Sequence, residues 1–299
     1  MPREKMKQQQ KILFVINPIS GDIDKNGMKT QIVNYMSEHN EQVEFYETKG
    51  KDDKQELSSL IEKIIPEKVV AVGGDGTCNM VAQVLINTEI KMGIIPQGSA
   101  NGLATELELP TEIHENLNII LKGKSRSIDV LQINNKYLSL HLSDIGFNAK
   151  VIERFEKGNS RGFWGYGKHF FKELWNMKSS KYKIEIDDKT IVKKAIMVVM
   201  ANATKYGTGA VVNPKGKLDD GRFEIVIFRP QKFVQFVKMA IPFFTRQIHQ
   251  LDFVDIYFGK KVIIKNYKHQ KLQIDGEIMG QPEQIYVEII PQSLSVLVP

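Results

Sequence analysis

Cysteine and long apolar runs are scarce in this sequence. The single cysteine, Cys78, excludes an intrachain disulfide, and the six histidines show no zinc-ligand spacing with it. No run approaches the roughly 20 apolar residues that a membrane span needs, since the nearest candidate, Phe233–Phe244, contains Lys238 and Pro242. The charged, glutamine-rich residues Met1–Gln10 predict neither a signal peptide nor an anchor. We therefore expect a cytoplasmic protein.

The phosphate-binding motif of P-loop kinases is also missing. The pattern G-x-x-x-x-G-K-[ST] does not occur, which excludes that class of kinase. The composition that is present, 42% hydrophobic and 25% charged over 299 residues, is typical of a globular chain with enough residues for two cores. The net charge of +6 suits anionic partners, namely nucleotides, nucleic acid or acidic membrane surfaces.

The first third of the chain alternates apolar strands with amphipathic helices, which predicts a parallel sheet with helices on its faces. The expected strands are residues 11–16, 43–46, 68–72 and 91–96, and the expected helices are residues 27–38, 53–65 and 80–86. Turn-forming loops follow the first, third and fourth strands. Ligands of open α/β sheets bind at such loops, beyond the carboxyl ends of the strands.

A glycine-rich stretch after the third strand is the strongest chemical signal. Residues 73–77 read Gly-Gly-Asp-Gly-Thr, and a second small-residue loop follows the fourth strand at residues 97–102. Glycines with positive φ would bring bare N–H groups against an anion, and the next helix would present its N-terminus to the same anion. Asp75 would then supply an oxygen ligand to magnesium. A simple glycine turn between a strand and a helix remains the alternative.

After Gly123 the sequence changes from alternating strands and helices to mostly short strands, and we place a domain boundary near residues 124–128. The predicted domains are an α/β domain over residues 1–127 and a β-rich sandwich over residues 128–293. Strands are expected at residues 128–133, 137–142, 182–186, 195–200, 223–228, 262–264, 272–274 and 286–290. Two helical segments, Phe163–Met177 and Lys232–Ile248, interrupt them.

Five motifs in order resemble those of the diacylglycerol kinase catalytic family, which includes soluble bacterial lipid kinases and the sphingosine and ceramide kinases. The resemblance covers nearly the whole chain, from about Lys11 to Pro299. The motifs are Asn17-Pro18 with Ser20-Gly21, Gly73-Gly74-Asp75-Gly76-Thr77, Pro96-Gln97-Gly98-Ser99-Ala100-Asn101, Leu218-Asp219-Asp220-Gly221 and Asp275-Gly276-Glu277.

The resemblance implies a fold and an activity. The first domain would be a nucleotide-binding domain of the phosphofructokinase and NAD-kinase type. The sandwich would bind the lipid substrate, and ATP would bind between the two domains. By the same analogy, the last strand, about residues 294–299, would return to the first domain. The expected reaction is magnesium-dependent transfer of the ATP γ-phosphoryl group to the hydroxyl of diacylglycerol or a similar lipid alcohol.

The resemblance also assigns roles to residues. Glu277 would accept the proton of the lipid hydroxyl with support from Asp275, and Asp75 would belong to the catalytic magnesium network. A further magnesium ion would bind Asp220, with the backbone carbonyls of Lys217 and Arg222. The residues expected at the nucleotide are Asn17, Thr48, Gly73, Gly74, Asp75, Gly76, Thr77, Asn79, Gly98, Ser99 and Asn101.

Several alternatives stay open at this point. Asp220-Gly221 and Asp275-Gly276 each lie between apolar runs and fit plain hairpin turns. Three positions depart from the family pattern, namely Met80, Gly102 and Asn148, which leaves the lipid undefined. A sphingoid-base or ceramide-type kinase and a non-catalytic nucleotide or lipid sensor therefore remain as hypotheses. An NAD-kinase-like enzyme is disfavoured, because the second glycine loop and the late Asp-Gly-Glu follow the lipid-kinase pattern.

The expected partners are ATP and a lipid alcohol at a membrane surface, without nucleic acid. We hypothesise peripheral docking on the inner, anionic membrane surface through Phe236–Phe244, which combines apolar bulk with Lys238 and Arg246. A buried amphipathic helix is the alternative interpretation of this segment. The sequence leaves open whether the chain forms a homo-oligomer.

Overall fold

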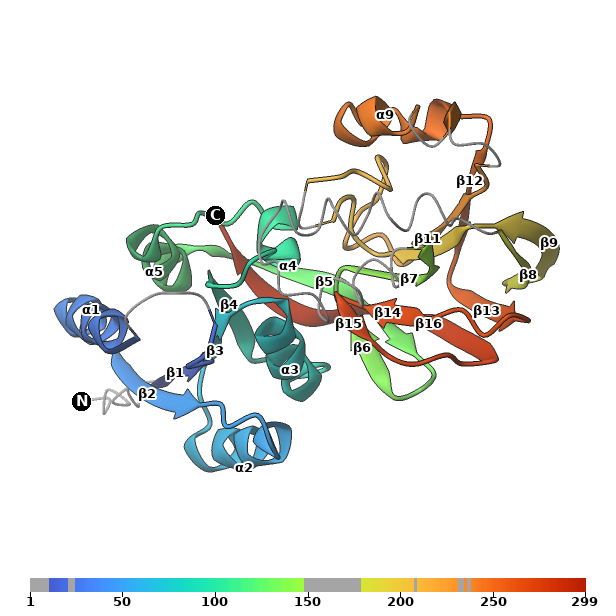
Figure 1. Cartoon of the computed structure of the whole chain (residues 1–299). Coiled ribbons are helices and arrows are strands. Elements are labelled where there is room, and N and C mark those ends of the chain that lie inside the picture. The colour runs from blue at the N-terminus through green and yellow to red at the C-terminus, as the bar shows by residue number, and fades with distance from the viewer. Residues whose placement is uncertain (1–10, 21–24, 148–178, 207–208, 231–233, 236–237) are drawn as a thin grey trace, which may run out of the picture. The chain divides into compact units, whose positions relative to one another are not determined.

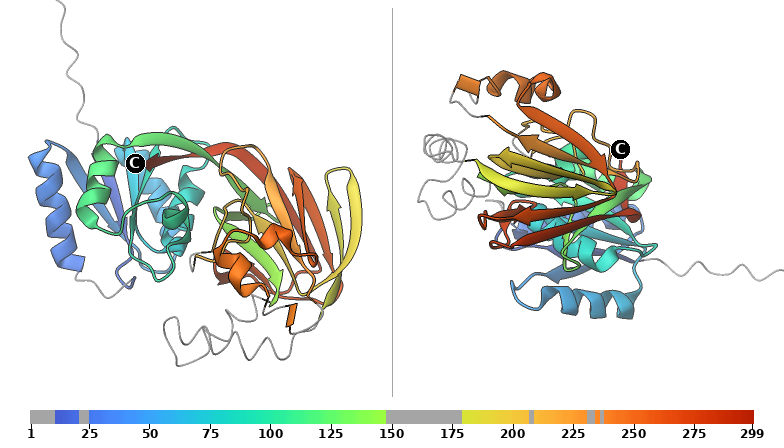
Figure 2. Two further views of the ribbon diagram at one scale, coloured as in Figure 1. Left: turned by 90° about the horizontal axis from the view of Figure 1, so that it is seen from above. Right: turned by 90° about the vertical axis from the view of Figure 1, so that its right-hand side faces the viewer.

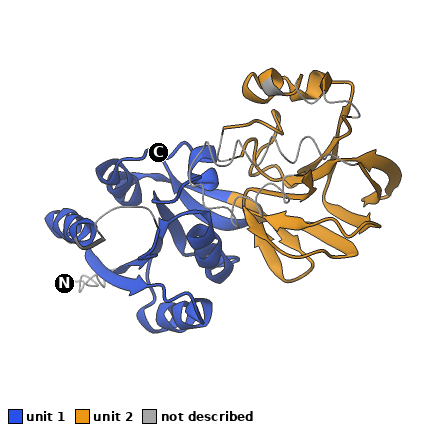
Figure 3. Ribbon diagram, in the orientation of Figure 1, with its two compact units in different colours: residues 1–127, 293–299 blue, residues 128–292 orange. Residues whose placement is uncertain are grey.

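The structure is a computed structural model that describes residues 11–20, 25–147, 179–206, 209–230, 234–235 and 238–299 (Figure 1). The predicted helix Phe163–Met177 and the unusual Asn148 lie outside the described residues. The chain forms two compact units (Figure 3). Unit 1 comprises residues 1–127 with 293–299, and unit 2 comprises residues 128–292.

Unit 1 contains a parallel sheet in the strand order β2-β1-β3-β4. The end of a long strand from the C-terminus, β16 (Gln284–Val298), pairs in parallel with β4 at Val296 and Met92. The other strands are β1 (Lys11–Ile16), β2 (Gln42–Glu47), β3 (Lys68–Gly73) and β4 (Lys91–Pro96).

Helices cover both faces of this sheet (Figure 2). The helices are α1 (Lys25–Glu38), α2 (Asp53–Ile64), α3 (Asp75–Leu85), α4 (Gly102–Glu106) and α5 (Ile113–Lys122). One core joins alternate residues of β1, among them Phe14, to Ile32 of α1 and Leu117 of α5. Helix α3 packs against β3, β4 and α2. Burial from both sides explains why the inner strands read as continuous apolar runs.

Unit 2 is an antiparallel sandwich, as the sequence predicts. One sheet has the order β16-β13-β8-β9, with β5 paired to β16 and β6 paired to β5. The other has the order β12-β11-β10-β7-β14-β15. Its strands are β5 (Lys124–Ile133), β6 (Tyr137–Ser139), β7 (Leu142–Gly146), β8 (Ser180–Ile186), β9 (Lys189–Ala195), β10 (Met197–Ala201), β11 (Phe223–Phe228), β12 (Val254–Gly259), β13 (Lys261–Asn266), β14 (Leu272–Ile274) and β15 (Glu277–Ile278).

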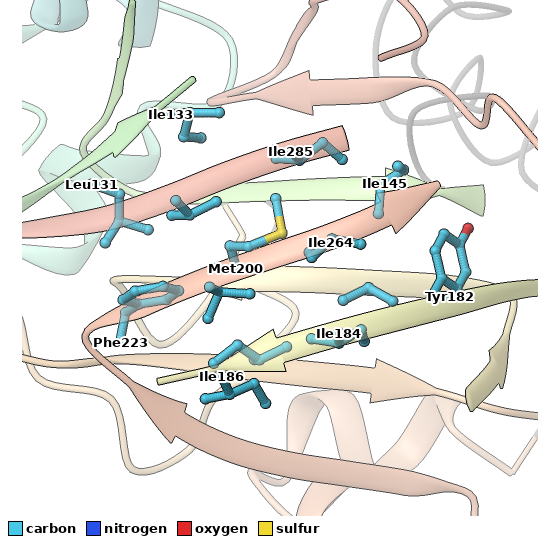
Figure 4. Close-up of a cluster of buried hydrophobic side chains, with 14 of the residues drawn as sticks. Leu131, Ile133, Ile145, Tyr182, Ile184, Ile186, Met200, Phe223, Ile264 and Ile285 are labelled. Carbon is cyan, nitrogen blue, oxygen red and sulfur yellow. The ribbon is translucent and has the colours of Figure 1, made fainter. Parts of the chain in front are cut away.

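The second sheet of unit 2 is apolar on both faces. On β10, Val198 and Met200 belong to the core shared with Ile264 of β13 and Ile285 of β16 (Figure 4). The intervening residue, Val199, belongs to a second cluster on the opposite side. That cluster also contains Met239, Ile248 and Phe253, from a segment that includes the short helix α9 (Ala240–Phe244) and a 3₁₀ turn (Ile248–Gln250). Successive side chains of a strand point to opposite faces, so both faces need a cover.

Three sequence predictions are wrong in detail. The strand predicted at residues 137–142 is interrupted at residues 140–141 and continues as a separate strand, β7. The two strands predicted near the C-terminus are one strand, β16. The long helix predicted over residues 232–248 is broken within its described part into helical residues 234–235, a turn at residues 238–239, α9 and the start of the 3₁₀ turn. Pro242, which lies inside α9, restricts the residue before it and donates no backbone hydrogen bond.

Candidate functional site

The predicted nucleotide residues follow four adjacent strands of unit 1. In the parallel register, Ile16 pairs with both Glu47 and Val72, and Gly73 pairs with Pro96. The carboxyl ends of the four strands therefore lie at nearly the same edge position of the sheet. Thr48, Asn17, the 73–77 loop and the 97–101 loop succeed one another along the carboxyl edge of the sheet, in the order of β2, β1, β3 and β4. With strands about 4.8 Å apart, this row is about 14 Å long.

Backbone hydrogen bonds hold the row together. The N–H of Thr48 donates to the carbonyl of Ile16 (2.9 Å), and the N–H of Asn17 donates to the carbonyl of Val72 (3.1 Å). Between the two glycine loops, the N–H of Gln97 donates to the carbonyl of Gly73 (2.8 Å). Each loop thus begins as a continuation of the ladder beneath it.

The two glycine loops touch each other. A Cβ on Gly98 would lie 2.5 Å from the Cα of Gly74, and a Cβ on Gly73 would lie 2.3 Å from Oγ1 of Thr77. The reason for glycine differs from the one we expected. Gly74 has φ of −92°, and none of the glycines with positive φ in the described residues belongs to these loops. Glycine is required here because only bare backbone allows the approach.

Helix α3 begins at Asp75, directly after the third strand, and has no side-chain cap. The first N–H groups of an α-helix have no acceptor within the helix, and the helix dipole adds positive potential at this end. Because Gly74 and Gly98 flank this end, bare backbone surrounds it. The arrangement is suited to an anion such as a phosphate group.

The carboxylate of Asp75 bridges the two loops. Its Oδ2 accepts a hydrogen bond from the N–H of Gly102 (2.9 Å), and its Oδ1 accepts one from the N–H of Leu103 (3.2 Å). Asp75 therefore binds the first N–H groups of α4 and fixes that helix beside the start of α3. An ionised carboxylate has about four lone-pair sites, so acceptor capacity remains for another ligand.

Two predicted nucleotide residues have amides engaged within the protein. Asn101, at φ of 49°, donates from Nδ2 to the carbonyl of Gly98 and accepts from its N–H, both at 2.8 Å. This pair of bonds closes the loop and leaves Ser99 exposed. Asn79 accepts a hydrogen bond from Nε2 of Gln83 (2.8 Å), one turn along α3. The structure thus places both amides where they support the loop and the helix.

In unit 2, Asp275 and Gly276 form the turn between β14 and β15, with φ of 46° and 96°. The hairpin-turn interpretation is therefore correct for this pair. The carboxylate of Asp275 also accepts hydrogen bonds from Oγ of Ser139 and from three consecutive N–H groups, at 2.8 to 3.1 Å. Those N–H groups belong to residues 140–142, where the predicted strand is interrupted. Glu277 follows the turn and is exposed.

The loop that carries Asp220 is anchored by a residue that the motif analysis missed. Asp129, fully buried on β5, accepts hydrogen bonds from the N–H of Gly221 and the N–H of Gln292, both at 2.7 Å. Its own N–H donates to the carbonyl of Leu218 (2.6 Å). A carboxylate between the apolar residues Ile128 and Val130 was the available signal in the sequence.

Asp220 itself is paired with a neighbour. Its carboxylate accepts hydrogen bonds from the backbone N–H (3.3 Å) and Nε (3.1 Å) of Arg222. Lys217 lies exposed in the same loop. No group of three or more His, Cys, Asp or Glu side chains suited to a metal ion occurs in the described part of the chain. A magnesium site here would therefore depend on backbone carbonyls beside Asp220.

A buried carboxyl group lies next to this loop. Glu224 on β11 is 2% exposed, and it accepts a hydrogen bond from Nδ2 of the buried Asn213 (2.5 Å). Burial raises the pKa of Glu224 to about 7, and the bond from Asn213 opposes that rise. The folded protein therefore holds this group protonated over a pH range in which the unfolded chain ionises it.

Comparisons with known proteins identify the class. Residues 11–133 match the diacylglycerol kinase catalytic domain, and residues 143–298 match the YegS C-terminal NAD kinase beta sandwich-like domain. A catalytic α/β domain followed by this sandwich defines a lipid kinase. The chain belongs to the diacylglycerol kinase and YegS family, as its motifs predict.

Curated relatives agree with this assignment. The chain is 28% identical over 218 residues to a protein of Staphylococcus epidermidis named diacylglycerol kinase, covering 71% of this chain and 68% of that protein. It is 27% identical over 238 residues to a probable lipid kinase YegS-like of Chromohalobacter salexigens, covering 78% and 76%. An uncharacterized Synechocystis protein, sll0036, is 28% identical over 77% of this chain, which spans 54% of that longer protein.

Solved structures share the fold. A diacylglycerol kinase from Bacillus anthracis str. Sterne superposes with a TM-score of 0.76 at 20% identity, covering 99% of this chain and 98% of that chain. A putative diacylglycerol kinase from the same strain superposes with a TM-score of 0.78 at 21% identity, covering 99% of both chains. The structural likeness therefore extends over both units.

The contact between the glycine loops predicts a graded effect of added methyl groups. Gly98→Ala should weaken ATP binding by about tenfold or more and lower the melting temperature, since its Cβ would meet backbone that cannot rotate away. Gly74→Ala should have a smaller effect, because its Cβ would lie 3.1 Å from the Cα of Gly98. Calorimetry of ATP binding and thermal melting measure both. Equal binding by Gly98→Ala and the parent protein would contradict a close-packed site.

The raised pKa of Glu224 predicts a pH dependence of stability. Between about pH 4.5 and 7, the folded state binds the proton more tightly than the unfolded chain, so the free energy of unfolding decreases as pH rises through this window. Glu224→Gln should remove roughly 3 kcal/mol of that decrease. Urea denaturation across the window tests this, with the exposed Glu62→Gln as control. A difference between Glu224→Gln and parent that is constant with pH would refute the prediction.

Proposed function

We propose that the chain is an ATP-dependent kinase that transfers the γ-phosphoryl group of ATP to the hydroxyl of diacylglycerol or a similar lipid alcohol, with magnesium. The observation that carries this proposal is the row of four strand ends in unit 1, where the glycine loops touch beside the uncapped start of α3. Family membership supplies the reaction class.

In this proposal, the first N–H groups of α3 bind the ATP phosphates. A Cβ at Gly73, Gly74 or Gly98 would clash with Thr77 or with the neighbouring loop, so glycine lets the loops pack closely beside this helix end. N–H groups at the start of a helix are suited to a phosphate. Asn17, Thr48 and Ser99 contact the nucleotide along the same edge. Asn101 acts indirectly, because its amide fixes the loop that presents Ser99.

Magnesium, when bound, neutralises charge on the phosphoryl oxygens. Asp75 is the residue that would hold the ion or its water shell, through the lone pairs that the N–H groups of Gly102 and Leu103 leave available. Oxygen donors suit this hard cation. In unit 2, Asp220 with the carbonyls of Lys217 and Arg222 would hold a second ion that stabilises the loop, which Asp129 already anchors.

Glu277 is proposed as the general base that takes the proton of the lipid hydroxyl. Its exposed carboxylate stands at the start of β15, directly after a turn of fixed conformation. Asp275 is a positioning residue, because its carboxylate holds the hairpin to residues 139–142 through four hydrogen bonds. A base on a rigid element can be held at a productive distance from the hydroxyl.

The test is transfer of labelled γ-phosphate from ATP to a panel of lipids and to NAD. Diacylglycerols, ceramides and sphingoid bases form the lipid arms, each with magnesium and with excess chelator. Magnesium-dependent labelling of diacylglycerol supports the proposal. Labelling of a sphingoid base or ceramide alone would move the assignment to that class, for which Gly102 is the motivating residue. ATP binding without any transfer would indicate a sensor.

Substitution of Asp75 should impair turnover. Asp75→Asn replaces an oxygen by an amide that donates, so one N–H at the start of α4 loses its acceptor and the metal loses a charged ligand. We expect kcat to fall by about tenfold or more, the size of one lost charge-assisted hydrogen bond. Steady-state kinetics measure it, with the exposed Asp188→Asn as control. Parent-like kcat would refute the role.

Substitution of Glu277 should separate chemistry from binding. Glu277→Gln should lower kcat by about two orders of magnitude or more, while the ATP dissociation constant stays within about twofold. Stopped-flow or single-turnover kinetics, with calorimetry of ATP binding, give both quantities. Glu283→Gln, also an exposed glutamate after the hairpin, is the matched control. A changed dissociation constant with unchanged kcat would make Glu277 a binding residue.

A further inference from the structure

Helix α9, which Figure 1 labels in unit 2, has the sequence Ala-Ile-Pro-Phe-Phe and carries apolar side chains on two sides. On one side, Met239 is 1% exposed, and the ring of Phe243 lies 5.8 Å from that of Phe228 on β11. The N–H of Val211 also donates to the carbonyl of Phe243 (2.7 Å). These contacts anchor the helix on the outer face of the second sheet, so α9 is part of the packed unit.

The other side of α9 carries large apolar side chains into solvent. Ile241 is 73% exposed and Phe244 is 67% exposed, and residues three apart in a helix lie on one face. Val234, one helical turn before Lys238, is 62% exposed. The alternative of a buried helix over residues 236–244 therefore does not hold for Ile241 and Phe244, although Met239 is buried. A helix that is apolar all round is ordinarily covered, which indicates that this face takes a partner.

The surroundings of this face are basic. Lys238 and Arg246 are exposed on either side of α9, and the sequence contains no Asp or Glu between Arg229 and Leu251. Arg246 donates from Nη2 to the carbonyl of Pro214 (3.0 Å), which brings the exposed Lys215 to the neighbouring loop. Apolar side chains flanked by cations match a bilayer whose head groups are anionic.

We propose that the outer face of α9 docks the protein on an anionic membrane, with Ile241 and Phe244 entering the acyl boundary. Lys238 and Arg246 bind the head-group phosphates. The inference rests on the proposed function, because a lipid alcohol with long chains resides in the bilayer and the enzyme must reach it there. No helix within the described ranges is long and apolar enough to cross a membrane. One apolar insertion alone binds weakly, and the added cations supply the second signal that stable attachment needs.

Sedimentation with vesicles tests the docking directly. The full chain should bind phosphatidylcholine vesicles that contain phosphatidylglycerol and should bind pure phosphatidylcholine vesicles far more weakly. Ile241→Ser with Phe244→Ser should weaken binding to the anionic vesicles by about tenfold or more. Lys238→Gln with Arg246→Gln should weaken it by about tenfold and reduce its dependence on the anionic lipid. Ile65→Ser, at a 79% exposed isoleucine of unit 1, should bind as the parent does.

Turnover separates this inference from the proposed function. The Ile241 and Phe244 double variant should lose activity on diacylglycerol embedded in anionic vesicles and keep it on a water-soluble short-chain diacylglycerol. If no lipid is phosphorylated but the variants still weaken binding to anionic vesicles, the proposed function fails and the docking surface stands. Parent binding that ignores anionic lipid, or a double variant that binds as the parent does, would overturn the docking. A double variant that only converts an oligomer to a monomer would also overturn it, by making the face a contact between copies.

Discussion

The backbone contact between Gly74 and Gly98 is the constraint on which the site in unit 1 depends. It brings the ends of β3 and β4 together closely enough that Asp75 can bind the first N–H groups of α4. The uncapped start of α3 then lies beside the bare backbone of Gly74 and Gly98. Larger residues in either loop would separate the two helix ends, and the positive potential of one would no longer act beside the other.

Three carboxylates of the structure accept hydrogen bonds from backbone that is distant in sequence. Asp75, Asp129 and Asp275 each accept hydrogen bonds from N–H groups of loops far away in sequence. Such charge-assisted bonds are stronger than neutral ones and orient a loop without adding bulk. Two of the three stand in motifs that attract attention as catalytic sequences. Their hydrogen bonds hold these loops in place. The chemistry proposed for Glu277 therefore depends on Asp275, whose carboxylate fixes the hairpin that carries Glu277.

The sequence predicts the strands of unit 1 well, because burial on both faces produces uninterrupted apolar runs that end at turn residues. It also predicts which residues gather at the carboxyl edge of that sheet. It cannot reveal why glycine is needed there, since the close approach involves Gly98, which is remote in sequence from Gly74. The break in the strand at residues 140–141 is hidden for the same reason. Its N–H groups bind Asp275, 135 positions away from Leu140.

Helix α9 shows a limit of hydrophobic patterning that concerns function. Periodicity assumes that an apolar face is a buried face, and it fails when a helix is apolar on two sides. Packing against Phe228 uses the side with Met239 and Phe243. Ile241 and Phe244 lie on the other side of the helix, where their side chains are exposed to water and add nothing to the core of unit 2. Their exposure on an anchored helix fits the proposed docking, because both side chains would leave water and become buried at the boundary of the bilayer.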